Sequence, residues 1–140
     1  MDAFGLVPNI IATIEATYKV IKFFEEIKSS GLDCNKYISE AGSSYILLQQ
    51  VRERLHSNVA DGHSMQPWSR HLQALAGEDG VLKHYKSDME QVANILLEVK
   101  NYRFRRVFVW HREKEKIEDI FRKVERHKSA IQLALSHDHL

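Results

Sequence analysis

Apolar residues in the first thirty positions recur at the spacing of a helix face. After Pro8 they stand three and four positions apart, at Ile10, Ile14, Tyr18, Ile21 and Phe24. Residues separated in this way share one side of a helix, so the pattern predicts an amphipathic helix. Further apolar residues widen that side beyond a single stripe: Ile11, Val20, Phe23 and Ile27. Pro8 suits the first turn of this helix and Gly31 its end.

The same periodicity predicts three more long helices. They span residues 35–56, residues 81–100 and residues 113–136. Their inward positions are Ile38, Ala41, Tyr45, Leu48, Val51 and Leu55 in the first, then Val81, Tyr85, Met89, Val92, Leu96 and Val99, then Ile117, Ile120, Phe121, Val124, Ile131 and Leu135. Each set recurs at three and four positions, which is the period of a helix buried on one face.

Residues 57–66 are polar and contain Asp-Gly, which indicates a loop, and a short helix is predicted from Pro67 to Gly77. No apolar–polar alternation is long enough for a strand, although "RVFVW" has the residue types of a short one. The predicted fold is an all-α, up-and-down bundle of four long helices plus one short helix.

Composition narrows the class of protein. The 140 residues suit one domain, and the chain ends in helical sequence like a domain cut from a longer protein. The single cysteine, Cys34, and the absence of a signal-peptide pattern favour the cytoplasm. The longest uncharged run considered, residues 3–14, is shorter than the about 20 residues that cross a bilayer as a helix.

Residue patterns for catalysis, cofactors and metals were sought and yield no candidates. The glycines of "AGEDG" lack the Lys and Ser/Thr of a phosphate-binding loop, and His137 and His139 point to different faces of a helix. Cys34 follows Asp33, whose charge would raise the pKa of the thiol, so a half-buried structural cysteine is expected. We expect no enzyme activity, cofactor or metal.

Net charge is +1, but it is unevenly distributed. Residues 100–128 contain eleven Lys/Arg and five Asp/Glu, and within them "NYRFRRVFVWHREKEK" interleaves arginines with aromatics. Exposed aromatics would stack on nucleic-acid bases beside phosphate-binding arginines. The favoured interpretation is structural: Val107, Val109 and some aromatics plug the bundle while the arginines extend outward. A basic surface remains in either case, and it would also attract anionic lipid headgroups.

The opening segment has two interpretations. A short apolar stretch with Gly5 and Pro8, before a helix that is apolar on more than one face, can be buried at rest and released to a membrane or partner. A core helix with a disordered start explains it equally well.

Three stretches resemble a known family. "MDAFGLVPNIIATIEATYKVIKFFEEIK" resembles the start of HeLo-like N-terminal domains of fungal NOD-like receptors, and "SYILLQQVRERLHS" their second helix. The end, "VWHREKEKIEDIFRKVERHKSAIQLALSHDHL", is similar to the family's tail, and it is the more specific match. The matched positions are Trp110, Ile117, Ile120, Val124, Glu125, Arg126, Lys128, Ile131, Leu133, Ala134, Leu135 and Asp138. His111-Arg112 replaces the family's Pro-Phe, so the start of the last helix is expected to be softer or shifted.

The resemblance implies a signalling or effector domain placed before a nucleotide-binding or repeat region, acting in programmed cell death or immunity. Related HeLo bundles, and the similar bundles of mixed-lineage-kinase-like and plant resistance proteins, oligomerise and permeabilise membranes through the first helix. Carried onto this chain, the inserting segment comprises Phe4, Leu6, Val7, Ile10, Ile11 and Ile14. The candidate contacts with an anionic surface are Arg103, Arg105, Arg106 and Arg112.

The expected partners are further copies of the chain, an anionic membrane recruited on activation, and the downstream domains. The alternative is a non-lytic association or autoinhibitory domain that recruits a protein through helix packing. A nucleic-acid-binding module ranks third.

Overall fold

The computed structural model describes residues 3–60, 75 and 80–138, and the side chains of residues 7–55, 75 and 80–136. This part of the chain forms α1 (Ala3–Lys28), α2 (Asn35–Ala60), α4 (Val81–Asn101) and α5 (Arg106–Asp138), and contains no strand. The prediction of an all-α helical bundle is therefore confirmed. The short helix predicted from Pro67 to Gly77 lies outside the described residues.

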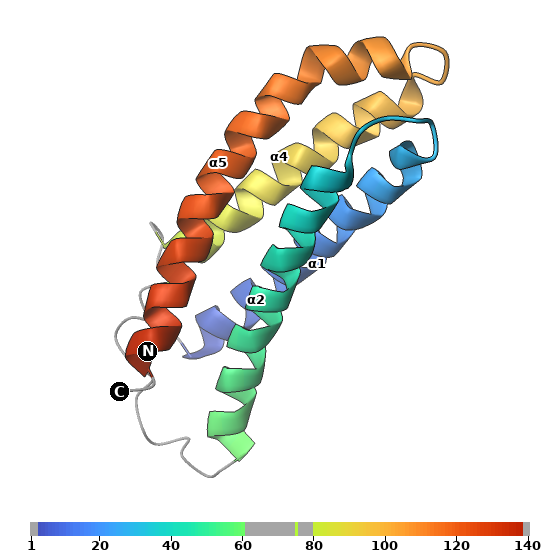
Figure 1. Ribbon diagram of the computed structural model, residues 1–140. Coiled ribbons are helices and arrows are strands. Elements are labelled where there is room, and N and C mark those ends of the chain that lie inside the picture. Colours follow the sequence, from blue (N-terminus) through green and yellow to red (C-terminus); the bar gives the residue numbers. More distant parts are fainter. Residues whose placement is uncertain (1–2, 61–74, 76–79, 139–140) are drawn as a thin grey trace.

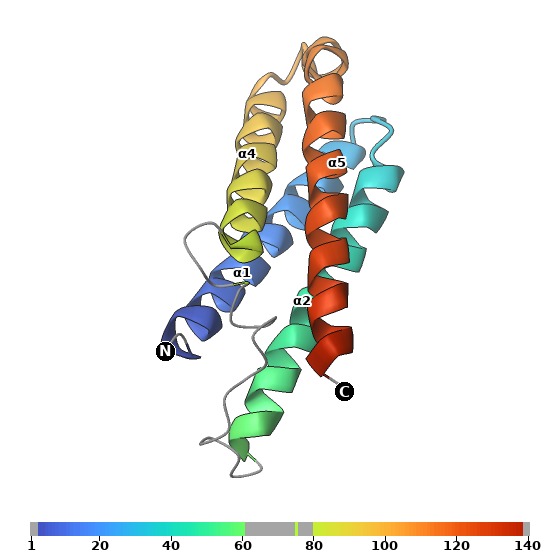
Figure 2. The same cartoon turned by 90° about the vertical axis from the view of Figure 1, so that its left-hand side faces the viewer.

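The helices pack as a bundle around α1 and α4. α1 contacts both α2 and α4, while α5 packs against α4 and, less extensively, against α2. Figures 1 and 2 show that the α1–α2 and α4–α5 connections lie at one end of the bundle. The N-terminal end of α1 and the C-terminal end of α5 lie at the other. Surfaces on the two connections therefore face away from the start of α1.

The end of α1 and both ends of α4 agree with the sequence prediction, whereas the end of α2 does not. Gly31 adopts a positive φ of 84° just after α1, a conformation that glycine accepts at little steric cost. α4 runs from Val81 to Asn101, close to the predicted range. α2 continues to Ala60, so residues 57–60 are helical and the predicted loop start at residue 57 is wrong.

Two predicted helix starts are also wrong. α1 begins at Ala3, so Pro8 lies inside it rather than in its first turn. Proline fits the helical φ, and near a helix end it removes only one backbone hydrogen bond, which explains why the helix continues through it.

α5 begins at Arg106, seven residues before the predicted start at Glu113, and "RVFVW" is helical rather than extended. The Val109 N–H donates to the Arg105 carbonyl at 2.8 Å. Residues 106–113 contain no proline or glycine to interrupt a helix, and the helix places Val109 and Trp110 in the core.

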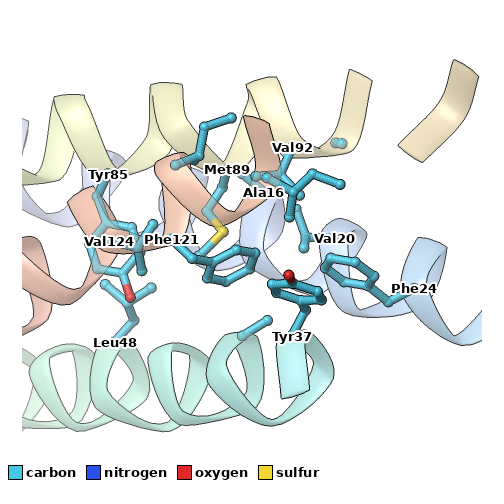
Figure 3. Close-up of a cluster of buried hydrophobic side chains, with 14 of the residues drawn as sticks. Ala16, Val20, Phe24, Tyr37, Leu48, Tyr85, Met89, Val92, Phe121 and Val124 are labelled. Carbon is cyan, nitrogen blue, oxygen red and sulfur yellow. The ribbon is translucent and has the colours of Figure 1, made fainter. Parts of the chain in front are cut away.

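The buried apolar side chains form one cluster shared by the four helices, part of which is shown in Figure 3. In α2, α4 and α5, nearly all the predicted inward positions are buried, and the remainder, Ile38, Tyr45, Val81 and Leu135, pack against the cluster half-buried. In α1, Ile10, Ile14 and Phe24 are buried as predicted, but Tyr18 is exposed. The inward face of α1 instead includes Thr13 and Thr17, whose hydroxyls donate to carbonyls one turn earlier, at 2.7 and 2.8 Å.

Aromatic side chains pack together where α1, α2 and α5 meet. The Phe24 and Tyr37 rings stack with centroids 5.7 Å apart, and the Trp110 ring meets both of them edge-on at 6.4 and 5.9 Å. The centroid of the Phe121 ring lies 5.5 Å from that of the Tyr37 ring. Aromatic contacts of this kind add to the burial of large apolar surfaces, so the cluster fixes the start of α5 against α1 and α2.

Polar contacts fasten α5 to its two neighbours. Glu118 of α5 accepts hydrogen bonds from Lys36 at 2.6 Å and from the Tyr37 hydroxyl, both on α2. The Asp88 carboxylate of α4 lies 2.8 Å from Nε2 of His127, and both side chains are largely buried. A buried carboxylate needs such a partner, because an unpaired one is costly to remove from water.

Replacing Trp110 with alanine should lower the free energy of unfolding by about 3–5 kcal/mol, because the truncation leaves a cavity among Phe24 and Tyr37. The matched control is Phe104→Ala, which removes an exposed aromatic six residues earlier and should cost less than about 0.5 kcal/mol. Urea unfolding measures both. Equal losses for the two variants would contradict the packing described above.

Candidate functional site

The basic aromatic strip of the sequence folds as the α4–α5 connection and the first turn of α5. We call residues 102–108 the tip. The tip begins directly after Asn101, the last residue of α4, and it closes one end of the bundle in Figures 1 and 2. A shallow open depression lies beside it, lined by Asn94, Leu97, Glu98, Asn101 and Tyr102.

Most apolar side chains of the tip face solvent. Phe104 is 102% exposed, and Tyr102, Val107 and Phe108 are also exposed. Only the next two residues, Val109 and Trp110, enter the core, with Trp110 1% exposed. The prediction that Val107, Val109 and some aromatics plug the bundle is therefore right for Val109 and wrong for Val107, and Trp110 is the one aromatic of residues 102–110 that is buried. Trp110 already fills the space between α1 and α2, so the preceding aromatics have no core position left.

Two of the four candidate arginines have structural partners. Arg106 donates from Nη1 to the Ser30 hydroxyl at 2.5 Å and from Nη2 to the Lys100 carbonyl at 3.0 Å. Arg112 pairs with Glu98 at 3.0 Å and with Glu113 at 3.1 Å. Their guanidinium groups therefore close helix ends and link α4 to α5, and they are poorly placed to bind an external anion.

Arg103 and Arg105 differ from these two. Both are exposed, and neither guanidinium group has a hydrogen bond or ion pair with any residue that the structure describes. They flank Phe104 in the turn between the helices. The structure thus reduces the four candidates to a pair of cations that remain available on either side of a fully exposed phenylalanine.

The base of the tip is tied to the rest of the bundle. Lys100, at the end of α4, pairs with Glu26 of α1 at 2.5 Å and lies 5.5 Å from the centre of the Phe23 ring. Arg106 reaches Ser30 in the α1–α2 connection. These contacts hold both ends of the turn, so Arg103, Phe104 and Arg105 are presented from a fixed platform.

The second candidate segment, the start of α1, is only partly accessible. Ile10 is 1% exposed and Ile14 is also buried, whereas Val7 is 38% exposed and Ile11 similarly so. The side chains of Phe4 and Leu6 lie outside the described residues. The six candidates therefore do not form one surface, because at least two of them belong to the core.

The two candidate regions lie far apart. α1 has 26 residues, which at 1.5 Å per residue places its start about 40 Å from its end beside the tip. The tip and the first turn of α1 therefore cannot both touch a flat surface that meets one end of the bundle.

The remaining chemically notable side chains serve the fold. Cys34 is buried, and its burial, with a smaller effect from Asp33, raises the pKa of the thiol to about 11. Glu113 is buried; desolvation raises the pKa of its carboxyl, but hydrogen bonds from Lys116 and Arg112 outweigh this effect and lower the pKa below its usual value. No cluster of metal-binding side chains occurs within the described part of the chain; His137 and His139 fall outside its described side chains.

Comparisons with protein-family models, curated proteins and solved structures find no significant match to this chain. Its function must therefore be inferred from its own residues. Among the described residues, no helix combines the length and apolar character needed to cross a membrane.

Alkylation of Cys34 by iodoacetamide should be slow in the native protein. At pH 8, a thiol with a pKa of about 11 has roughly 200-fold less thiolate than one with the ordinary value of about 8.5, and burial slows access further. The native rate should keep rising beyond pH 9, whereas the rate in urea should level off. A second thiol introduced by Phe104→Cys is the control and should react quickly. Equal native rates for the two thiols would contradict the burial of Cys34.

Proposed function

We propose that this chain is an up-and-down bundle, completed by the short helix predicted from Pro67 to Gly77, that serves as a non-enzymatic effector domain at membranes. In this proposal it is the signalling part of a NOD-like receptor similar to those with HeLo-like domains. On activation it oligomerises, and α1 permeabilises the membrane in programmed cell death or immunity. The protein is cytoplasmic before it is recruited.

An exposed apolar stripe on α1 is the observation that carries this proposal. Val7, Ile11 and Tyr18 are exposed and share one side of the helix, away from the buried side of Ile10, Val20 and Phe24. A helix that serves only as a core element needs one apolar face. The additional stripe is suited to another apolar environment, either the acyl region of a bilayer or a second protein.

The burial of Ile10 sets the order of events. Exposing Ile10 and Ile14 to water costs roughly 3–6 kcal/mol in total, a large share of the 5–15 kcal/mol that stabilises a typical domain. The outer stripe can contact a bilayer at no such cost. Insertion of all six candidates would therefore follow membrane contact or oligomerisation, which supply a new apolar environment for the released residues.

The double variant Val7→Glu/Ile11→Glu should reduce dye leakage from anionic vesicles at least about tenfold, because each aliphatic side chain buried in lipid contributes about 1.5–3 kcal/mol. Both positions are exposed, so the bundle should keep its helical circular dichroism and its melting transition. The matched control, Ser43→Glu/Gln50→Glu, adds the same two charges to exposed sites on α2 and should leak like the original protein. Leakage that survives in the folded α1 variant would rule out permeabilisation by α1.

A protein-association domain is the second candidate, and the Tyr18–Tyr45 contact favours it. These rings lie 6.3 Å apart and extend the stripe of α1 onto α2, which forms a face of the kind that receives a partner helix. A protein that binds no vesicles and captures a defined protein partner through Tyr18 would support this candidate over the membrane function.

A further inference from the structure

We propose that the tip is a docking surface for anionic membranes, which the bundle meets with the α4–α5 end. This inference deepens the proposed membrane function, because it assigns first contact to a region that the exposed stripe of α1 does not include. The partner is a bilayer surface bearing anionic phosphate headgroups. Three properties of the tip support this assignment: its available charge, its exposed aromatics and its rigid base.

The charge of the tip is available to an external anion. The guanidinium groups of Arg103 and Arg105 have no partner among the described residues, whereas those of the neighbouring Arg106 and Arg112 are already engaged. An arginine that bonds within the fold gives up part of that contact when it binds a headgroup. Arg103 and Arg105 give up none, and their planar guanidinium groups suit phosphate oxygens.

The apolar part of the tip suits the interface between headgroups and acyl chains. Phe104 stands fully exposed between the two arginines, with Tyr102 before it and Phe108 after it. Aromatic rings concentrate at this depth of a bilayer, where a ring can be buried while polar groups stay hydrated. The order cation, phenylalanine, cation places the ring to enter lipid while the arginines remain at the phosphates.

The rigid base favours binding because little order is lost on contact. Arg106 and Lys100 attach the two ends of the turn to Ser30 and Glu26 of the neighbouring segments. The core position of Trp110 fixes the start of α5 directly behind it. A surface that is already held in place loses less conformational entropy on binding than a mobile loop does.

Nucleic acid fits the tip less well. Single-stranded nucleic acid is bound along a positively charged groove that follows several phosphates. The tip offers two arginines whose guanidinium groups have no partner among the described residues, on either side of the fully exposed Phe104. Affinity from two phosphate contacts would be small at physiological salt. A membrane, in contrast, presents many headgroups to one small projection.

Docking through the tip gives the bundle a defined orientation. The first turn of α1 then lies about 40 Å from the surface, at the opposite end of the molecule. Docking and permeabilisation are thus separate steps: a bundle that stands on its tip must tilt or release α1 before the stripe reaches lipid. The two steps can be tested with different variants.

The test is co-sedimentation of the full chain with phosphatidylcholine vesicles that contain or lack phosphatidylserine. Arg103→Glu/Arg105→Glu should weaken binding to the anionic vesicles at least about 30-fold, because each arginine near such a surface contributes about fivefold. Phe104→Ala/Phe108→Ala should weaken binding without removing its dependence on anionic lipid. The matched control, Lys123→Glu/Arg126→Glu, reverses two exposed charges on the side of α5 and should bind within about threefold of the original protein.

Several results would overturn the docking surface. They are equal weakening by the tip and control charge reversals, unchanged binding in the folded tip variant, and binding of a single-stranded oligonucleotide through the tip without vesicle binding. Circular dichroism of each variant separates lost binding from lost folding.

Vesicles that are bound through the tip but never leak would uphold the docking surface and refute permeabilisation. Leakage that needs Val7 and Ile11 but not the tip would uphold permeabilisation by α1 and refute docking through the tip.

Discussion

The packing of Trp110 against Phe24 and Tyr37 is the contact on which the rest of the molecule depends. It joins α5 to α1 and α2 at the end of the bundle where the connections lie. Because the indole fills this position, α5 must already be helical several residues earlier, at Arg106. Only residues 102–105 then remain to connect α4 to α5, in a short turn, and their side chains are exposed. The exposed aromatics of the tip are thus a consequence of how the core is closed.

This constraint divides one short stretch of sequence into two roles. Arg106 bonds to the end of α4 and Arg112 links α5 to α4. Arg103 and Arg105 instead extend from the turn between these two helices. A similar division occurs in α1, where Ile10 is part of the core and Val7 is exposed. The two exposed regions lie at opposite ends of the bundle. In the proposed mechanism the tip makes first contact with anionic lipid, and the stripe of α1 acts only after the bundle reorients or opens.

The sequence predicted the helices because their apolar period is strong, and it placed Val109 and Val124 correctly in the core. It located α5 too late because "RVFVW" favours strands locally, whereas the core positions of Val109 and Trp110 require a helix. It also assigned the wrong exposure to Val107 and Tyr18. Periodicity shows which residues could share a face, but it does not show which faces find a neighbour. Arg106 bonds to Ser30, which lies 76 residues away in the sequence, and to the Lys100 carbonyl near the end of α4. These partners follow only from the tertiary fold. The HeLo-like function inferred from resemblance remains a proposal.

The most direct measurement of the central claim is the depth to which the tip enters a bilayer. Because Cys34 is buried, Phe104→Cys and, separately, Leu133→Cys each provide one exposed site for a fluorescent label. These sites lie near opposite ends of α5, about 40 Å apart along the helix. Spin-labelled lipids in anionic vesicles should quench the label at position 104 strongly and the label at position 133 weakly. Stronger quenching at position 133, or equal quenching at both, would contradict docking through the tip.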